Sequence, residues 1–349
     1  MLSGHNNEKI LVSVIIPCYN AEDFVYEAVS SIINQTYQTL QIIVIDDCST
    51  DKTGEILKSL QLKDDRILYI KNETNLKLVE CLNIGIRLSK GKYIARMDAD
   101  DISSTDRIAK QVSFLELNSE IGLLGSYIEV ISSSKDSRNI MKLPVCDSEI
   151  RAYLFVGSPF FHPTVMIRKS VLIENNCFYN SIFYRSEDYK MWIDILDKTK
   201  GANLPEVLLK YRILESSETR LAEKNLIERR KIASKIHKDF LNKFNINLNE
   251  TEQLIYTCSM NRAQLPYVTN IIGKNPSILI NIFEKIINSL TSETKLDVDK
   301  LKSYFGERVI VFIIYSKAYL TCNGILKLFS KYTFLGFRNI LKDKFNVNY

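Results

Sequence analysis

LVSVIIPCYN, residues 11–20, and LQIIVIDD, residues 40–47, are the stretches that decide the fold class. Each begins with a mainly apolar run of strand length, broken only by Ser13 in the first and Gln41 in the second, and ends in polar residues. Between them, residues 21–35 carry Val25 and Val29 at helical spacing. Strand, helix and strand in this order are typical of a crossover connection between parallel strands. The two runs therefore predict two parallel strands of one buried sheet.

The same alternation continues over the first hundred residues. Two further helices and two further strands are predicted at residues 51–62, 66–70, 78–89 and 92–97. The sequence therefore predicts an α/β fold with a mostly parallel sheet flanked by helices. Such sheets bind ligands beyond the carboxyl ends of their strands, so the polar residues at those ends are the candidates for a functional site.

The composition of the chain changes after about residue 218. Residues 1–218 contain 25 Lys+Arg and 30 Asp+Glu, a net charge of −5, whereas residues 219–349 contain 21 and 11, a net charge of +10. Helical patterns in this second part fall at residues 223–244, 278–290 and 301–329. We therefore expect a basic, helical C-terminal region whose partners differ from those of the first part.

The composition also argues against several classes of protein. No apolar stretch reaches the length of a membrane-spanning helix, and the N-terminus does not have the pattern of a secretory signal. The seven cysteines are scattered and never spaced as a metal-binding pair, and there are only three histidines. We expect reduced thiols in a cytoplasmic protein, and no metal site rich in histidine.

Three acidic groups lie at predicted strand ends or helix starts: Asp46-Asp47, Asp98-Ala99-Asp100-Asp101 and Glu187-Asp188. Taken alone, the first is explained by a turn and the third by negative charge at a helix N-terminus. The second group differs, because three carboxylates in four residues repel one another unless a cation or several donors compensate. An Asp-x-Asp at a strand end suits Mg²⁺ or Mn²⁺, which take oxygen ligands and keep positions open for phosphate.

In order and spacing, these segments resemble the N-terminal half of family-2 glycosyltransferases of the GT-A fold. The resemblance covers roughly residues 10–214 and rests on VSVIIPCYN, IIVIDDCSTDKT, GKYIARMDADD, HPTVMIRKSV and SEDYKMWIDI. It points to bacterial enzymes that build lipopolysaccharide, lipooligosaccharide or capsule, including the β-1,3-N-acetylglucosaminyltransferase type. It implies a catalytic domain at 1–218, with nucleotide-sugar binding in 10–110 and the acceptor side in 111–218, before a helical region at 219–349.

The resemblance implies a set of residues that bind a nucleotide-sugar donor, usually one linked to UDP: Pro17, Tyr19, Asn20, Asp47, Asp98 and Asp100. Carried over to this chain, the first three line the nucleotide pocket, Asp47 contacts the base and Asp98 lies near the ribose. Asp100 would hold the divalent metal, Mn²⁺ or Mg²⁺, that bridges the diphosphate.

On the acceptor side, the resemblance implies that Asp188 is the base that deprotonates the acceptor hydroxyl. Glu187 is its neighbour, and His162 falls where the family has the floor of the acceptor side. Trp192 lies four residues after Asp188 on the same predicted helix face, and we interpret it as packing that fixes the base. Tyr184, just before the acidic pair, is a further candidate for contact with the acceptor.

Two features depart from other members of the family. Lys77 stands in the loop Asn75-Leu76-Lys77-Leu78, where members often carry glycine, and its side chain either narrows the pocket or contacts phosphate. No Gln-x-x-Arg-Trp motif follows Asp188. Since that motif resembles a signature of processive polysaccharide synthases, we expect one sugar to be transferred per encounter.

The predicted reaction is a single displacement at the anomeric carbon, which inverts its configuration. A divalent ion stabilises the diphosphate leaving group, and one carboxylate deprotonates the acceptor. The expected acceptor is a saccharide or a lipid-linked saccharide, and no nucleic acid is expected as a partner. The basic region at 219–349 is either a solvated helical face or a peripheral anchor on the anionic, cytoplasmic face of a membrane.

Two alternatives stay open at this stage. A nucleotidyltransferase also uses paired carboxylates and a metal on an α/β sheet, but no Gly-rich phosphate loop follows the first predicted strand. A catalytically idle nucleotide-sugar-binding protein would not need the acidic group at residues 98–101 or Asp188.

Overall fold

The computed structural model describes residues 10–131, 139–214, 225–291, 294–320 and 333–337. The chain forms two compact units, each described here by itself. The first comprises residues 1–146 and 160–214, and the second comprises residues 147–159 and 215–349. Residues 147–159, which lie inside the first part of the chain by sequence, therefore pack with the C-terminal helices.

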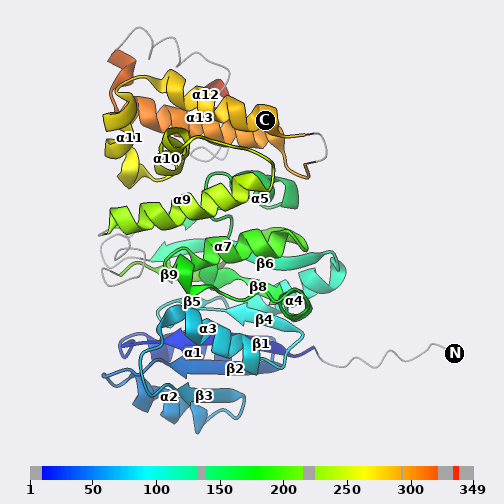
Figure 1. Ribbon diagram of the computed structural model, residues 1–349. Helices are drawn as coiled ribbons and strands as arrows, with labels where there is room; N and C mark the ends of the chain where they lie inside the picture. The colour runs from blue at the N-terminus through cyan, green and yellow to red at the C-terminus, as the bar shows by residue number, and fades with distance from the viewer. Residues whose placement is uncertain (1–9, 132–138, 215–224, 292–293, 321–332, 338–349) are drawn as a thin grey trace, which may run out of the picture. The chain divides into compact units, whose positions relative to one another are not determined.

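The first unit is built on one mixed sheet in the order β3-β2-β1-β4-β8-β6-β9-β5, with β7 paired to β6 (Figure 1). Its strands are β1 Val12–Cys18, β2 Leu40–Asp46, β3 Ile67–Lys71, β4 Tyr93–Arg96, β5 Ile102–Ser103, β6 Ile121–Ile131, β7 Asn139–Met141, β8 Met166–Arg168 and β9 Lys200–Arg212. Strands β3, β2, β1 and β4 run parallel, and β8 pairs antiparallel with β4. The predicted α/β class with a mostly parallel sheet and a helical C-terminal region is confirmed.

Helices alternate with these strands. They are α1 Val25–Ile33, α2 Thr53–Gln61, α3 Lys77–Leu88, α4 Arg107–Leu117, α6 Lys169–Glu174 and α7 Glu187–Leu196. Strands β1 and β2 are buried along nearly their whole length, because helices cover the sheet, and this explains why their residues are mainly apolar. Helix α3 lies close to β1, since a methyl group at Gly85 would come within 2.5 Å of Ile15 Cγ2.

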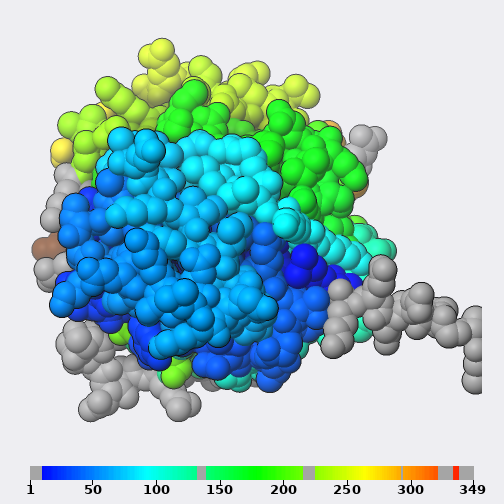
Figure 2. Space-filling view, turned by 90° about the horizontal axis from the view of Figure 1, so that it is seen from below, coloured from blue at the N-terminus to red at the C-terminus, as the bar shows by residue number. Residues whose placement is uncertain are grey.

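The chain order of the parallel strands positions the site. From β1 the chain adds β2 and β3 on one side and then returns to place β4 on the other side of β1. The carboxyl ends of β1 and β4 therefore flank the point at which the winding direction reverses, where sheets of this kind bind ligands. Figure 2 shows a face formed mainly by these N-terminal segments, coloured blue to cyan.

The second unit consists of packed helices. They are α5 Asp147–Tyr153, α9 Leu226–Asn242, α10 Glu250–Ser259, α11 Leu265–Ile272, α12 Pro276–Ser289 and α13 Val298–Tyr315. Phe155 joins this core through an edge contact with Phe240 and accepts a hydrogen bond from Tyr256 Oη at its carbonyl. The helix predicted at 301–329 ends at Tyr315, and residues 321–329 lie outside the described ranges. None of the described helices is both long enough and apolar enough to cross a membrane.

Candidate active site

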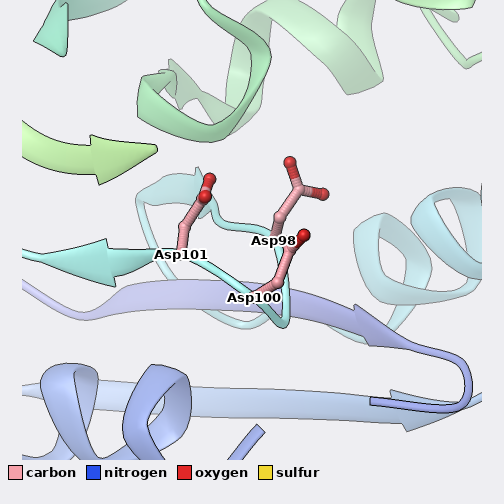
Figure 3. Close-up of side chains that lie close together, drawn as sticks. All are labelled: Asp98, Asp100 and Asp101. Atoms are coloured by element: carbon pink, nitrogen blue, oxygen red, sulfur yellow. The ribbon is translucent and has the colours of Figure 1, made fainter. Parts of the chain in front are cut away.

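The acidic group after β4 forms one compact cluster. Oxygen atoms of Asp98, Asp100 and Asp101 all lie within 4.8 Å of one another. The three side chains point to the same side of the loop that follows β4 (Figure 3). We call these three residues the acidic cluster. It stands at the carboxyl end of a central strand, where the sequence predicted the site.

The positive groups around the acidic cluster do not compensate for its three carboxylates, and the pKa values of two of them are raised. Burial, followed by the charges of Asp98 and Asp100, raises the pKa of Asp101 to about 9. Burial, followed by the charge of Asp98, raises the pKa of Asp100 to about 6. Asp101 Oδ1 accepts a hydrogen bond from Arg212 N at 2.9 Å, but its buried Oδ2 has no donor in the part of the chain that the structure describes.

The donor set of the acidic cluster fits a divalent cation. Its carboxylate oxygens are the hard ligands that Mg²⁺ and Mn²⁺ prefer. The buried, unsatisfied Oδ2 of Asp101 and the raised pKa values of Asp100 and Asp101 mark a site that lacks positive charge. A cation placed among these oxygens would supply that charge.

A buried arginine holds one member of the acidic cluster in place. Arg96, the last residue of β4, donates from Nη1 to Asp98 Oδ2 at 2.6 Å, and its Nη2 binds Oδ1. Arg107 of α4, also buried, donates to the Arg96 carbonyl at 2.8 Å. Neither arginine was among the residues predicted from the sequence to form the site. Basic residues just before and after an acidic group were the available signal.

The predicted nucleotide-binding residues gather at the same edge of the sheet. Pro17 lies in β1, and Tyr19 and Asn20 follow that strand directly, with Tyr19 half-exposed. Asp47 follows β2, the neighbour of β1, while Asp98 follows β4, its neighbour on the other side. The structure therefore brings together side chains that are up to 81 positions apart in sequence, from Pro17 to Asp98.

Asp47 is buried and fully engaged with the loop before α3. Its Oδ1 accepts hydrogen bonds from Asn72 Nδ2 and Leu76 N, and its Oδ2 accepts one from Lys77 N, all at 2.8 Å. The structure therefore gives Asp47 a clear local task, which is to hold residues 72–77 in position. Contact between Asp47 and a nucleotide base stays a prediction.

The acidic pair that opens α7 contains one buried and one partly exposed carboxylate. Glu187 is 5% exposed, and burial, followed by the charge of Asp188, raises its pKa to about 7. Asp188 is intermediate in exposure. The charges of Arg96, Asp188, Glu187 and Asp98 all act on the buried Tyr179 hydroxyl. Asp98 of the acidic cluster and the acidic pair of α7 therefore act on the same buried hydroxyl, although they are some 90 positions apart in sequence.

An aromatic cluster supports this neighbourhood. His162 Nε2 lies 2.9 Å from Tyr179 Oη, and the Trp192 ring packs edge-on against His162 at 5.6 Å. Trp192 is completely buried, which agrees with its interpretation as packing behind the acidic pair. Burial of the imidazole, together with the charge of Arg96, lowers the pKa of His162 well below its ordinary value. His162 is therefore a neutral hydrogen-bonding partner of Tyr179.

Several residues around the site adopt left-handed backbone conformations that the sequence did not reveal. Asn20 after β1, Cys48 after β2, Lys77 at the start of α3 and Arg185 before α7 have φ values of 47°, 62°, 70° and 66°. Non-glycine residues adopt such values rarely and at some cost in energy, and they often cluster at functional sites.

A cavity of about 760 Å³ opens beside these elements. Helix α3 and the loop before it form one wall, and the segment that leads to α7 forms the other. The lining residues are Leu76, Lys77, Val79, Glu80, Asn83, Asn176, Phe178, Tyr179, Asn180, Ser181 and Tyr184. We call this space the Lys77 cavity.

Comparison with known proteins places the chain in a family. The model of the family described as "Glycosyl transferase family 2" matches residues 13–176. An uncharacterized glycosyltransferase of Haemophilus influenzae is 34% identical over 334 residues, which cover 92% of this chain and 96% of that protein. The Escherichia coli UDP-Glc:alpha-D-GlcNAc-diphosphoundecaprenol beta-1,3-glucosyltransferase WfaP is 31% identical over 235 residues, which cover 65% and 86%.

The fold of the chain is also similar to that of a solved glycosyltransferase. Staphylococcus aureus TarS, residues 1–349, solved in complex with UDP-GlcNAc, superposes with a TM-score of 0.59 at 15% identity, covering 89% of this chain and 92% of that one. At this identity the likeness shows the fold alone. With the H. influenzae relative matched over nearly its whole length, the resemblance stated from the sequence is confirmed, and the chain is a glycosyltransferase of the GT-A fold that belongs to glycosyl transferase family 2.

Proposed function

We propose that this glycosyltransferase moves one sugar per encounter from a UDP-linked donor to a saccharide acceptor, with inversion and with the help of a divalent metal. The observation that carries the proposal is that the charges of Asp98, in the acidic cluster after β4, and of Glu187 and Asp188, at the start of α7, all act on Tyr179. One group suits the donor diphosphate and the other suits the acceptor hydroxyl. The complex of TarS with UDP-GlcNAc and the UDP-glucose donor in the name of the E. coli relative support a UDP-linked donor.

On the donor side, Pro17, Tyr19 and Asn20 line the nucleotide pocket at the end of β1. Asp47 lies at the base end, where its hydrogen bonds to the backbone of Leu76 and Lys77 keep the adjoining loop in place. Asp98 lies near the ribose. These positions flank the switch point of the sheet, where a nucleotide can lie across the strand ends.

Asp100 holds the metal, Mn²⁺ or Mg²⁺, and Asp101 supplies further negative charge beside it. When bound, the metal stabilises the negative charge that develops on the leaving diphosphate. Arg96 keeps the Asp98 carboxylate oriented by its two hydrogen bonds. Fixed charges of this kind need little reorganisation as the bond to the sugar breaks.

Asp188 accepts the proton of the acceptor hydroxyl. It is intermediate in exposure, so an acceptor can reach it, whereas Glu187 is buried. A base must lie within hydrogen-bond reach of the proton that it removes. On the acceptor side Glu187 precedes Asp188 in α7, Trp192 packs against His162, and His162 supports the floor through Tyr179.

We further propose that the acceptor is a saccharide or lipid-linked saccharide of surface polysaccharide biosynthesis, with lipopolysaccharide or capsule as the product. The diphosphoundecaprenol acceptor in the name of the E. coli relative supports this proposal. A basic face on α9 supports action on the cytoplasmic side of an anionic membrane surface, because Lys231, Lys235 and Lys238 are exposed at one-turn spacing.

A donor screen tests the proposed function. Nucleotide sugars are added with Mn²⁺ in a thermal-shift assay, where a true donor at 100 times its Kd stabilises the fold by about 2.7 kcal/mol. The stabilising donor is then incubated with candidate acceptors. Release of UDP without pyrophosphate supports transfer of a sugar. Release of sugar 1-phosphate with transfer of UMP would identify a nucleotidyltransferase, and binding without turnover would identify an idle binding protein.

A further inference from the structure

Lys77 is held in an unfavourable backbone conformation. Its φ is 70°, and its N–H donates to Asp47 Oδ2 at 2.8 Å and to Asn75 Oδ1 at 3.1 Å. Glycine would adopt this conformation without strain, whereas a side chain costs about 1 kcal/mol or more. A lysine at this position therefore bears a conformational cost that calls for a function of its side chain.

The Lys77 cavity is formed before any ligand binds. Asn83 Nδ2 on α3 donates to the Tyr179 carbonyl at 2.9 Å, and Tyr179 N donates back to Asn83 Oδ1 at 3.0 Å. This reciprocal pair ties the wall from α3 to the wall from residues 176–184. A volume of about 760 Å³ is within the range of pockets for small organic ligands.

One of the lining residues, Lys77, is a cation without an ion pair in the part of the chain that the structure describes. Lys77 is exposed, and no carboxylate in the described ranges forms an ion pair with its ammonium group. Glu80, one turn later on α3 and also in the lining, pairs instead with Arg87. Tyr184 and the amides of Asn176 and Asn180 complete a lining of the kind that binds polar ligands. The lining therefore favours a ligand with an anionic group.

The location of the cavity favours the acceptor, and not the donor, as its ligand. None of its lining residues belongs to the acidic cluster or to the segment of residues 17–20, and it adjoins the base end of the proposed donor site only through the backbone of Leu76 and Lys77, which binds Asp47. Its wall includes Tyr179, which binds His162 and is acted on by the charge of Asp188. The cavity therefore lies on the side of the site where the proposed function puts the acceptor.

We propose that the Lys77 cavity binds a phosphate or diphosphate group of the acceptor, with the Lys77 ammonium as its cationic ligand. The inference rests on the proposed function, because it needs an acceptor on the side of Asp188. Lysine binds phosphate as a point charge, and the flexible stem of Lys77 can follow substrates that differ in length. The substrate class is then a saccharide whose linkage to its carrier includes phosphate.

The test compares two ligands on four proteins by calorimetry. The first ligand is hexyl diphosphate in EDTA buffer, where no metal can recruit it to the acidic cluster. The second is UDP with excess Mn²⁺. The proteins are the wild type, Lys77→Gly, Lys77→Arg and Lys63→Met. Lys63 is an exposed lysine two residues after the end of α2 and does not line the cavity. Lys77→Gly removes the side chain and relieves the left-handed strain, so its Tm should not fall below that of the wild type.

We expect Lys77→Gly to weaken hexyl diphosphate binding at least fivefold, Lys77→Arg to stay within threefold of the wild type, and Lys63→Met to change nothing. UDP binding should be the same in all four proteins. Equal hexyl diphosphate affinity in Lys77→Gly and wild type would overturn the inference. Weaker UDP binding with unchanged hexyl diphosphate binding would assign Lys77 to the donor and overturn the acceptor assignment. If the wild type fails to bind UDP with Mn²⁺, the proposed donor site itself fails.

Discussion

Arg96 and Asp98 form a two-bond ion pair at the end of β4, with Nη1 donating to Oδ2 at 2.6 Å and Nη2 bound to Oδ1. The Arg96 side chain is only 5% exposed, while that of Asp98 is 28% exposed. The pair therefore has its cation inside the fold and its carboxylate at the surface of the site. The two hydrogen bonds fix the orientation of the Asp98 carboxylate, the first member of the acidic cluster.

This pair yields a prediction about stability. Arg96→Met leaves the Asp98 carboxylate without its partner and should lower the free energy of unfolding by about 3–5 kcal/mol. The double variant Arg96→Met/Asp98→Asn should lose clearly less than the sum of the two single changes, because neither charge is left alone. Urea denaturation of the three variants measures these values. Additive losses would mean that the two side chains act independently.

Metal binding depends on Asp100 in the proposed site. Asp100→Asn should weaken the Mn²⁺-dependent affinity for UDP and reduce turnover at least about a hundredfold, because a charged ligand to the diphosphate's metal is lost. Calorimetry of UDP at several Mn²⁺ concentrations measures the affinity. Asp65→Asn, an exposed change before β3, serves as the matched control. Unchanged metal dependence in Asp100→Asn would remove this residue from the metal site.

The raised pKa values predict how the acidic cluster responds to pH. Asp100 and Asp101 bind protons more tightly in the folded protein, at about 6 and about 9, than the ordinary value of 3.8. Without metal, the stability contribution of each group is therefore present below pH 3.8 and is lost as pH rises through the folded pKa. Mn²⁺ must displace these protons, so its affinity should increase between pH 6 and 9.

Proton release makes this prediction measurable. At pH 7 Asp101 holds a proton in the metal-free protein, and about one proton should leave as Mn²⁺ binds. Calorimetry in buffers of different ionisation enthalpy counts the protons. The Tm without metal should fall from pH 5 to pH 8, and Mn²⁺ should reduce that fall. A release of zero protons would contradict the proposed ligand set.

The proposed base predicts a separation of rate from affinity. Asp188→Asn keeps the size of the side chain but cannot accept a proton, so transfer should slow by about two to four orders of magnitude. The Kd for the UDP-sugar should barely change, because the residues proposed to hold it are on other elements. Glu187→Gln should cost less, since Glu187 is buried. The measurements are kcat, donor Kd and NMR of the anomeric centre of the product.

Two results would defeat this mechanism. A near-normal rate in Asp188→Asn, with a large loss in Glu187→Gln, would move the base to Glu187. A product that keeps the anomeric configuration of the donor would exclude a single displacement.

The basic face of α9 predicts attraction to anionic lipid. Each lysine near such a surface contributes about 1 kcal/mol, so replacing Lys231, Lys235 and Lys238 by Gln should weaken binding roughly a hundredfold. Flotation of the full chain with vesicles of phosphatidylglycerol and phosphatidylcholine measures it, and wild-type binding should fall as salt rises. Replacing Lys58 and Lys63 of the first unit by Gln is the control. Salt-insensitive recovery that is equal in all three proteins would leave α9 as a solvated face.

Local sequence was enough to predict the elements that carry the site. The buried runs in β1 and β2 and the alternation with α1, α2 and α3 follow from hydrophobic periodicity, which depends on neighbouring residues. Parallel strands then bring their carboxyl ends to one edge, so Asp47 and the acidic cluster could be predicted to meet there. The roles of the individual side chains came from the resemblance to the family.

The partners of those side chains could not be predicted, because they come from distant parts of the chain. Asp47 is saturated by donors 25 to 30 residues away, and this changes it from an open carboxylate to one that holds a loop. The strain at Lys77 and the cavity beside it depend on that loop and on residues 176–184. Neither the backbone strain at Lys77 nor the cavity can be predicted from the residues that are adjacent in sequence.

Sequence alone determined the α/β class, the order of the strands along the chain, the placement of acidic residues at strand ends and the basic character of the C-terminal region. Tertiary structure decided which carboxylates are buried, and so shifted the pKa values of Asp101 and Glu187, and it decided that residues 147–159 pack with the C-terminal helices. The physical reason is range. Periodicity and charge are properties of adjacent residues, whereas burial, hydrogen-bond saturation and electrostatic coupling depend on groups that only folding brings together.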